Sequence, residues 1–129
     1  GSFGYELNLS AISEEDKNCV REQIDAYHKY WHLIHDGAYY RLTNPFEDRE
    51  AAAWLFVSED KGEALLNTVA LETHGNPLSF TLEGLDPEAM YRDEDTGTEY
   101  PGAGLMSAGI PIPPRTGEYQ AFQVHLRRI

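Results

Sequence analysis

The stretch AAAWLFVSEDKGEALLNTVALE, residues 51–72, decides the fold of this chain. It contains two apolar runs, residues 52–58 and 64–72, separated by Glu59-Asp60-Lys61-Gly62, which is typical of a tight turn. Two short apolar runs joined by such a turn predict a pair of antiparallel strands. Apolar residues alternate on both sides of this pair, so we expect further strands at residues 39–43, 78–82, 89–93, 99–100 and 119–127.

Turn residues elsewhere predict how these strands are connected. His74-Gly75-Asn76-Pro77 and Asp95-Thr96-Gly97 indicate two more hairpins, while the Gly- and Pro-rich residues 102–117 predict a long irregular connection. Every second residue of a strand faces the same way, so two sets of apolar side chains are expected to point into a core. These sets are Leu78, Phe80 and Leu82 on one strand, and Phe122, Val124 and Leu126 on the last.

A long helix is predicted before the first strand. It begins at Ser13-Glu14-Glu15-Asp16, which resembles a capping box, and ends at Asp36-Gly37, where Gly37 suits a left-handed cap. The expected fold is therefore mainly β, an antiparallel two-sheet β-sandwich preceded by one long α-helix. One apolar stripe of the helix is expected to face the core, namely Val20, Ile24, Tyr27, Trp31 and Ile34.

A second stripe, Cys19, Ala26, Tyr30 and Leu33, lies about 110° around the same helix. A helix that is apolar on two sides is usually buried between two bodies, and only the sandwich is found in this sequence. We therefore predict that this stripe is a domain interface. The alternative is that both stripes form one wide face covered by the sandwich.

Charge and composition exclude several classes of partner. The chain has 10 Lys and Arg against 22 Asp and Glu, a formal charge of -12, so it repels nucleic acid and anionic membrane surfaces. Cys19 is the single cysteine and is expected to be a buried apolar residue. The sequence shows no membrane-spanning run and no signal peptide, and we expect a cytoplasmic location.

Three histidines raise the question of a metal site. His28, His32 and His35 are spaced so that one helix places them on a single strip beside Asp25. The competing interpretation, which we favour, is that they cover the edge of the apolar face and bond to neighbouring loops. No cofactor is expected.

The remaining polar groups give no catalytic assignment. The acidic runs Glu14-Glu15-Asp16, Glu47-Asp48 and Asp93-Glu94-Asp95 fall at a helix start and in turns, where acids are usually solvated. Neither a nucleophile elbow nor a phosphate-binding loop occurs. The aromatic residues are expected to fill the core and the contact with the helix, with sugar stacking at an exposed edge of the sandwich as the alternative. They are Trp31, Trp54, Tyr39, Tyr40, Tyr91, Tyr100 and Tyr119.

Seven blocks of residues extend in order through nearly the whole chain. They are FGYELNL (residues 3–9), YHKYWHLI (27–34), GAYYRL (37–42), NPFE (44–47), WLFVSEDK (54–61), GLDP (84–87) and GLMSAGIP (104–111). In content, order and spacing these blocks resemble the end of glycoside hydrolase family 36, whose members are mainly α-galactosidases. Asn8 stands where the family usually has aspartate.

The resemblance implies that residues 1–37 are the last strand and helix of a catalytic barrel, and residues 38–129 a C-terminal sandwich. The family's two catalytic aspartates lie on earlier barrel strands, and no position here matches them. The chain alone is therefore expected to be inactive, while its parent cleaves terminal α-linked galactose, as in raffinose or melibiose, with retention. The barrel is the implied partner, and the parent is expected to be a homo-oligomer.

Three functional hypotheses follow. The first is a non-catalytic structural domain of an α-galactosidase, with an exposed apolar stripe. The second is a carbohydrate-binding module with clustered exposed rings. The third, an independent metal-dependent enzyme, requires an ion at His28, His32 and His35.

Overall fold

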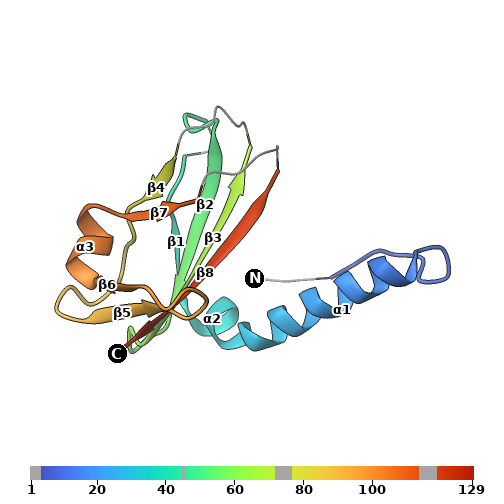
Figure 1. Ribbon diagram of the computed structural model, residues 1–129, viewed down its shortest axis with the longest axis horizontal. Coiled ribbons are helices and arrows are strands. Elements are labelled where there is room, and N and C mark those ends of the chain that lie inside the picture. The colour runs from blue at the N-terminus through green and yellow to red at the C-terminus, as the bar shows by residue number, and fades with distance from the viewer. Residues whose placement is uncertain (1–3, 45, 72–76, 114–118) are drawn as a thin grey trace.

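The computed structural model describes residues 4–44, 46–71, 77–113 and 119–129. The first two elements are helices, and a β-structure with one further short helix follows them (Figure 1). The elements are α1 (Glu14–Lys29), α2 (Trp31–Asp36), β1 (Ala38–Arg41), β2 (Ala51–Val57), β3 (Glu63–Ala70), β4 (Leu78–Phe80), β5 (Met90–Asp93), β6 (Glu99–Pro101), α3 (Gly102–Ser107), β7 (Ile110–Ile112) and β8 (Ala121–Arg128).

The strands form two antiparallel sheets, as the sequence predicted. The larger sheet has six strands in the order β1-β2-β3-β8-β5-β6, and the smaller sheet pairs β4 with β7. The predicted turns at residues 59–62 and 95–97 join β2 to β3 and β5 to β6. Lys61 and Gly97 have positive φ of 56° and 73°, the backbone conformation that such tight turns need.

The main core lies between the two sheets. Leu55, Leu66 and Val124 face it from three adjacent strands, because they are Cα partners in the β2-β3-β8 register. The two predicted inward faces are confirmed, since Leu82, Val124 and Leu126 are buried and Leu78, Phe80 and Phe122 pack against the same cluster. Tyr91 is fully buried here, and its hydroxyl donates to the Lys61 carbonyl at 2.8 Å.

The prediction of an irregular connection at residues 102–117 is wrong for its described part. Residues 102–107 form α3 and residues 110–112 form β7, because Leu105, Ile110 and Ile112 are all buried in the core. Gly109 turns the chain between them at a φ of 84°, which favours glycine. Pro111 is tolerated because β7 belongs to a two-stranded sheet, where one side of each strand is an edge.

The predicted hairpin at residues 74–77 falls almost entirely outside the described residues. Of the described strands on either side, β3 belongs to the six-stranded sheet and β4 to the two-stranded sheet.

The predicted long helix is interrupted and ends differently from expectation. Its capping box is confirmed, since the Asp16 amide donates to Ser13 Oγ at 3.0 Å and the Ser13 amide donates to Asp16 Oδ2 at 3.2 Å. Tyr30, at φ -100° and ψ 8°, separates α1 from α2. Gly37 is extended, at φ -73° and ψ 154°, so the left-handed cap is wrong. Glycine is needed there for space, because a Cβ would lie 2.4 Å from the Leu33 carbonyl oxygen.

Candidate functional site

Helix α1 leaves the sandwich and extends away from both sheets (Figure 1). None of its residues is buried, although Val20, Ile24, Ala26 and Tyr27 are partly covered. Most helical stability in proteins comes from packing an apolar face against other elements. A helix of 16 residues with no buried position therefore presents a surface that a further body can cover. No helix of the described part has the length and apolar character needed to cross a bilayer.

The two apolar stripes are placed differently from prediction. The stripe expected to face the core contributes no buried residue, and its Trp31 is 47% exposed. From the second stripe, Tyr30 and Leu33 are 7% and 0% exposed and pack against Leu65 of β3. Their expected exposure to a second body is wrong, because the break at Tyr30 turns this side of α2 onto the sheet.

The other two members of the second stripe lie on α1. Cys19 is exposed, which corrects the prediction that it is buried, and Ala26 is half-buried. The assignment of Cys19 and Ala26 to a domain interface stays a prediction.

A groove of about 810 Å³ separates α1 from the outer face of the larger sheet. Trp54 and Phe56 of β2 form part of its wall, and they point away from the main core because Leu55 between them faces inward. The Gln123 amide donates to Asn67 Oδ1 at 2.7 Å across the groove floor. The helix side is formed by Gln23, Ala26, Tyr27, Tyr30 and Ile34.

Three rings contact one another across the bend between α1 and α2, which is called the elbow below. The Tyr27 hydroxyl and His35 Nε2 are 2.9 Å apart, so one hydrogen bond spans the break. Trp31 stacks on His35 with ring centroids 3.6 Å apart and meets Tyr27 edge-on at 5.4 Å. These contacts oppose straightening of the elbow.

On the sheet side, one carboxylate joins the elbow to two strands. Oε2 of Glu63, the first residue of β3, lies 3.3 Å from His32 Nε2 and 3.0 Å from His125 Nε2. Since a carboxylate only accepts hydrogen bonds, both imidazoles donate from Nε2. His125 is 4% exposed, its ring meets Tyr30 edge-on at 5.2 Å, and its Nδ1 has no hydrogen-bond partner in the described part of the chain.

Arginine and acidic side chains extend this cluster. Arg127 lies 3.5 Å from Glu63 Oε1 and 3.7 Å from Glu94 Oε2. Burial by itself raises the pKa of Glu63, but the hydrogen bonds from His125 and His32 and the charge of Arg127 outweigh it and lower the pKa below 4.5. Glu63 is thus held as an anion among donors.

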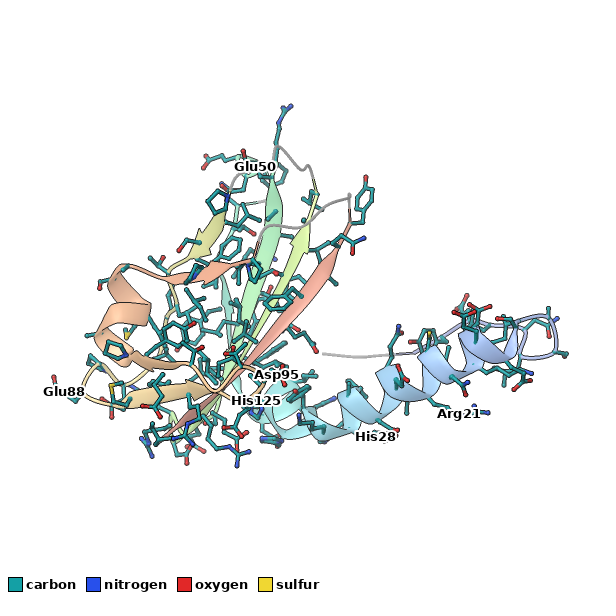
Figure 2. All side chains as sticks on the ribbon, in the orientation of Figure 1. Arg21, His28, Glu50, Glu88, Asp95 and His125 are labelled. Carbon is teal, nitrogen blue, oxygen red and sulfur yellow. The ribbon has the colours of Figure 1, made fainter. Side chains whose placement is uncertain are left out.

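A cation on α1 faces the loop between β5 and β6. The pKa of Lys29 is raised, chiefly by the side chain of Tyr30 and also by the charges of Asp95 and Glu94. Its Nζ lies 4.8 Å from the centroid of the Tyr30 ring. Figure 2 shows Asp95 and His125 at the end of the sandwich that meets the helices, while His28 and Arg21 lie along α1.

The histidine strip is not assembled as a metal site. His32 pairs with Glu63 and His35 with Tyr27, and the His28 ring lies 6.3 Å from the Tyr27 ring. The break at Tyr30 rotates His32 and His35 relative to His28. Among the described residues, no three His, Cys, Asp or Glu side chains are grouped so that they could hold a metal ion.

The acidic runs mainly stabilise local structure. Asp16 caps α1, and Asp48 Oδ2 accepts the Asn44 amide at 2.6 Å. Asp93 differs from the prediction of a surface residue, since it is 6% exposed and accepts hydrogen bonds from Asp95 and Thr96 within the hairpin turn.

The aromatic residues divide between core and surface. Tyr91 is buried and Trp54 is half-buried on the groove side, whereas Tyr39 and Tyr119 are 53% and 72% exposed. The prediction that aromatic rings fill the core therefore holds for Tyr91 and is wrong for Tyr39 and Tyr119.

Sequence reasoning did not single out Glu63, His125 or Arg127. Glu63 and Arg127 are Cα partners in the β3-β8 pairing, and His125 lies two residues before Arg127 on the same face. The available signal was an acid at a strand start and basic residues near the end of the last strand. It becomes informative only when these two strands are known to be neighbours.

Comparison with known proteins gives a consistent picture. Residues 51–126 match the family described as glycosyl hydrolase family 36 C-terminal domain. The chain is 50% identical over 125 residues to the bifunctional α-galactosidase/sucrose kinase AgaSK of Mediterraneibacter gnavus, covering 95% of this chain and 13% of that protein. It is 37% identical over 131 residues to the α-galactosidase AgaA of Geobacillus stearothermophilus, covering 100% of this chain and 18% of that protein.

Solved structures match over almost the whole fold. The galactosidase domain of AgaSK superposes with a TM-score of 0.92 at 47% identity, and the Geobacillus AgaA structure with a TM-score of 0.90 at 34% identity. Each match covers 98% of this chain and 18% of the other chain. A variant of AgaA was solved in complex with raffinose. The chain thus spans less than a fifth of the length of these relatives.

Proposed function

Because the chain belongs to glycosyl hydrolase family 36 as a C-terminal domain, we propose that it is the non-catalytic end of an α-galactosidase and packs against the part that carries the catalytic residues. Relatives at 50% and 37% identity are α-galactosidases, and this chain corresponds to 13% and 18% of their lengths. The proposed substrate of the whole protein is a terminal α-linked galactoside such as raffinose or melibiose. In this proposal the galactoside binds to the catalytic part of the whole protein and not to this domain.

The observation that carries the proposal is α1 with its groove. A helix without a buried residue stands beside a groove of about 810 Å³ lined by Ala26, Tyr27, Trp54 and Phe56. An apolar groove of this kind is a surface for a further protein body. Since the match to the AgaSK galactosidase domain covers 98% of this chain, α1 is part of the shared structure rather than an isolated feature.

This arrangement leads us to propose a boundary between the sandwich and the catalytic barrel. We assign residues 38–129 to the sandwich, which contains the matched residues 51–126, and residues 1–37 to the catalytic barrel as its last strand and helix. Residues 4–8 are in no helix or strand, and the Tyr5 hydroxyl donates to Gln23 of α1. In the proposed whole protein these residues find strand neighbours in the barrel. Assembly of the whole protein as a homo-oligomer and a cytoplasmic location stay predictions.

Sugar binding by the sandwich is the less supported alternative. Trp31 has one ring face covered by His35, and Tyr39 packs against Phe56 with centroids 5.6 Å apart. Stacking on a sugar requires open ring faces. The contacts of Trp31 and Tyr39 with other rings of this chain therefore make these two residues weak candidates for a sugar-stacking site.

Hydrolysis of a chromogenic α-galactoside tests the proposal. The 129-residue chain and the product of the full reading frame that contains it are assayed side by side. We expect turnover by the full product and none by the chain alone, with the chain folded by circular dichroism. Turnover by the chain would place catalytic carboxylates within it, and an inactive full product would contradict the assignment to an α-galactosidase.

A further inference from the structure

The direction in which α1 leaves the sandwich is set at the elbow. Beyond Lys29 the chain enters α2, whose Leu33 is buried against the sheet, whereas α1 itself has no buried residue. The covered cluster of Tyr30, Leu33 and Leu65 attracts α2 to the sheet. Apolar attraction is non-directional, so this small cluster alone leaves rotation of α2 weakly restrained.

Glu63 restrains the rotation of α2 on the sheet. Its Oε2 accepts hydrogen bonds from His32 of α2 at 3.3 Å and from His125 of β8 at 3.0 Å, while Oε1 faces Arg127 at 3.5 Å. Hydrogen bonds weaken steeply when their angle departs from linearity, so two donors on one oxygen define an orientation. His125 is 96% buried and fixed in β8, which makes it the rigid side of this contact.

Side-chain contacts across the break couple the orientation of α2 to that of α1. The hydrogen bond between Tyr27 and His35 and the Trp31–His35 stack connect the last turn of α1 with α2 across the break. Rotation of α2 is therefore transmitted to α1 instead of being absorbed at Tyr30.

We propose that Glu63 is a conformational anchor, which fixes the angle between α1 and the sandwich by holding His32 and His125 on one carboxylate oxygen. This anchor holds α1 and the adjacent groove in a defined geometry before any further protein body is bound. Such pre-organisation reduces the entropy lost when two bodies associate. The proposal concerns this chain by itself and does not depend on the activity proposed for the longer protein.

Distance measurements between spin labels test the anchor in the 129-residue chain. The native Cys19 on α1 is exposed and provides one labelling site, and Glu88→Cys on the exposed far end of the sandwich provides the other (Figure 2). Double electron–electron resonance is expected to give one narrow distance distribution for this doubly labelled chain. With Glu63→Ala added, the distribution is expected to widen or to gain a second population.

The matched control is Glu99→Ala, which removes a carboxylate that pairs with Arg92 at 2.9 Å on β6, a strand separated from β3 by β8 and β5 in the same sheet. It should leave the distribution narrow. If Glu63→Ala does not fold, the same distance measurement is made on His32→Ala. This variant is expected to fold because the His32 side chain is 54% exposed and its loss removes only one donor. A broad distribution without any elbow substitution, or a narrow one in folded Glu63→Ala or His32→Ala, would overturn the proposal.

Discussion

The Tyr27 hydroxyl and the His35 imidazole are joined by a hydrogen bond of 2.9 Å that crosses the break between α1 and α2. The two residues lie eight positions apart, about one turn more than the pairs that face each other within one continuous helix. The contact therefore exists because the chain bends at Tyr30. It connects a helix that extends away from the sandwich to one that is packed on it.

Tyr27→Phe should weaken this connection without disturbing the sandwich. A net loss of about 0.5–1.5 kcal/mol is typical for one hydrogen bond, and the lower end applies at this exposed site. We expect a small decrease in helical circular dichroism and an unchanged main unfolding transition in urea. Tyr39→Phe, on a ring that packs against Phe56 of the sheet, is the matched control and should leave the helical signal unchanged.

Leu33→Asp should prevent stable docking of α2. The sequence led us to expect Leu33 to be exposed as part of an apolar stripe, and the structure reverses this, since Leu33 is 0% exposed. Truncation of a buried leucine costs about 2–5 kcal/mol, and a buried carboxylate adds its desolvation. Chemical unfolding should show a loss of at least about 3 kcal/mol. Leu7→Asp, at a site that is 43% exposed, should be nearly neutral, and equal stability of the two variants would contradict this account.

The contribution of Glu63 to stability should depend on pH. Its folded-state pKa is lowered below 4.5, so the folded state favours the anion, and the stabilisation is fully present above the unfolded-state pKa. It is lost as the pH falls through the folded-state pKa. We expect the difference in unfolding free energy between the wild-type chain and Glu63→Gln to be constant near pH 6 and to shrink below about 4.5. A difference that stays constant down to pH 3 would argue against a stabilising anion.

Trp54→Glu tests the role of the groove without changing a residue of the main core. The side chain is half-buried on the outer face of β2, so the isolated chain should keep its fold. In the full reading-frame product the same change places a charge in the proposed contact, and we expect lower thermal stability and lower α-galactosidase activity. Tyr119→Glu, at a site that is 72% exposed, serves as the control. Equal effects of Trp54→Glu in both proteins would mean that the groove is not a contact surface.

The strands and the capped helix were predictable because their signals are local. Alternating residues such as Leu78, Phe80 and Leu82 report the face of their own strand, and Ser13 with Asp16 form a cap within one turn. The helix α3 and strand β7 were missed because Gly and Pro suggest loops, while the burial of Leu105 and Ile110 by distant strands decides the outcome. Local composition does not reveal such partners.

The candidate site was predictable only in part. The two-sided character of the helix indicated a covering body, but the side each residue faces depended on the break at Tyr30. That break is favoured by the packing of Tyr30 against His125, a residue 95 positions later in the chain. The same holds for Glu63, whose partners His32 and His125 come from α2 and β8. Contacts between elements far apart in sequence fix this site.

Amide hydrogen exchange of α1 in the 129-residue chain and in the full reading-frame product tests the central claim most directly. If the rest of the protein covers α1 and the groove, the amides of residues 14–29 exchange much more slowly in the full product than in the chain alone. Those of the buried β3 exchange at similar rates in both and serve as the internal reference. Equal exchange of α1 in the two proteins would show that the helix is not covered, and would contradict the account.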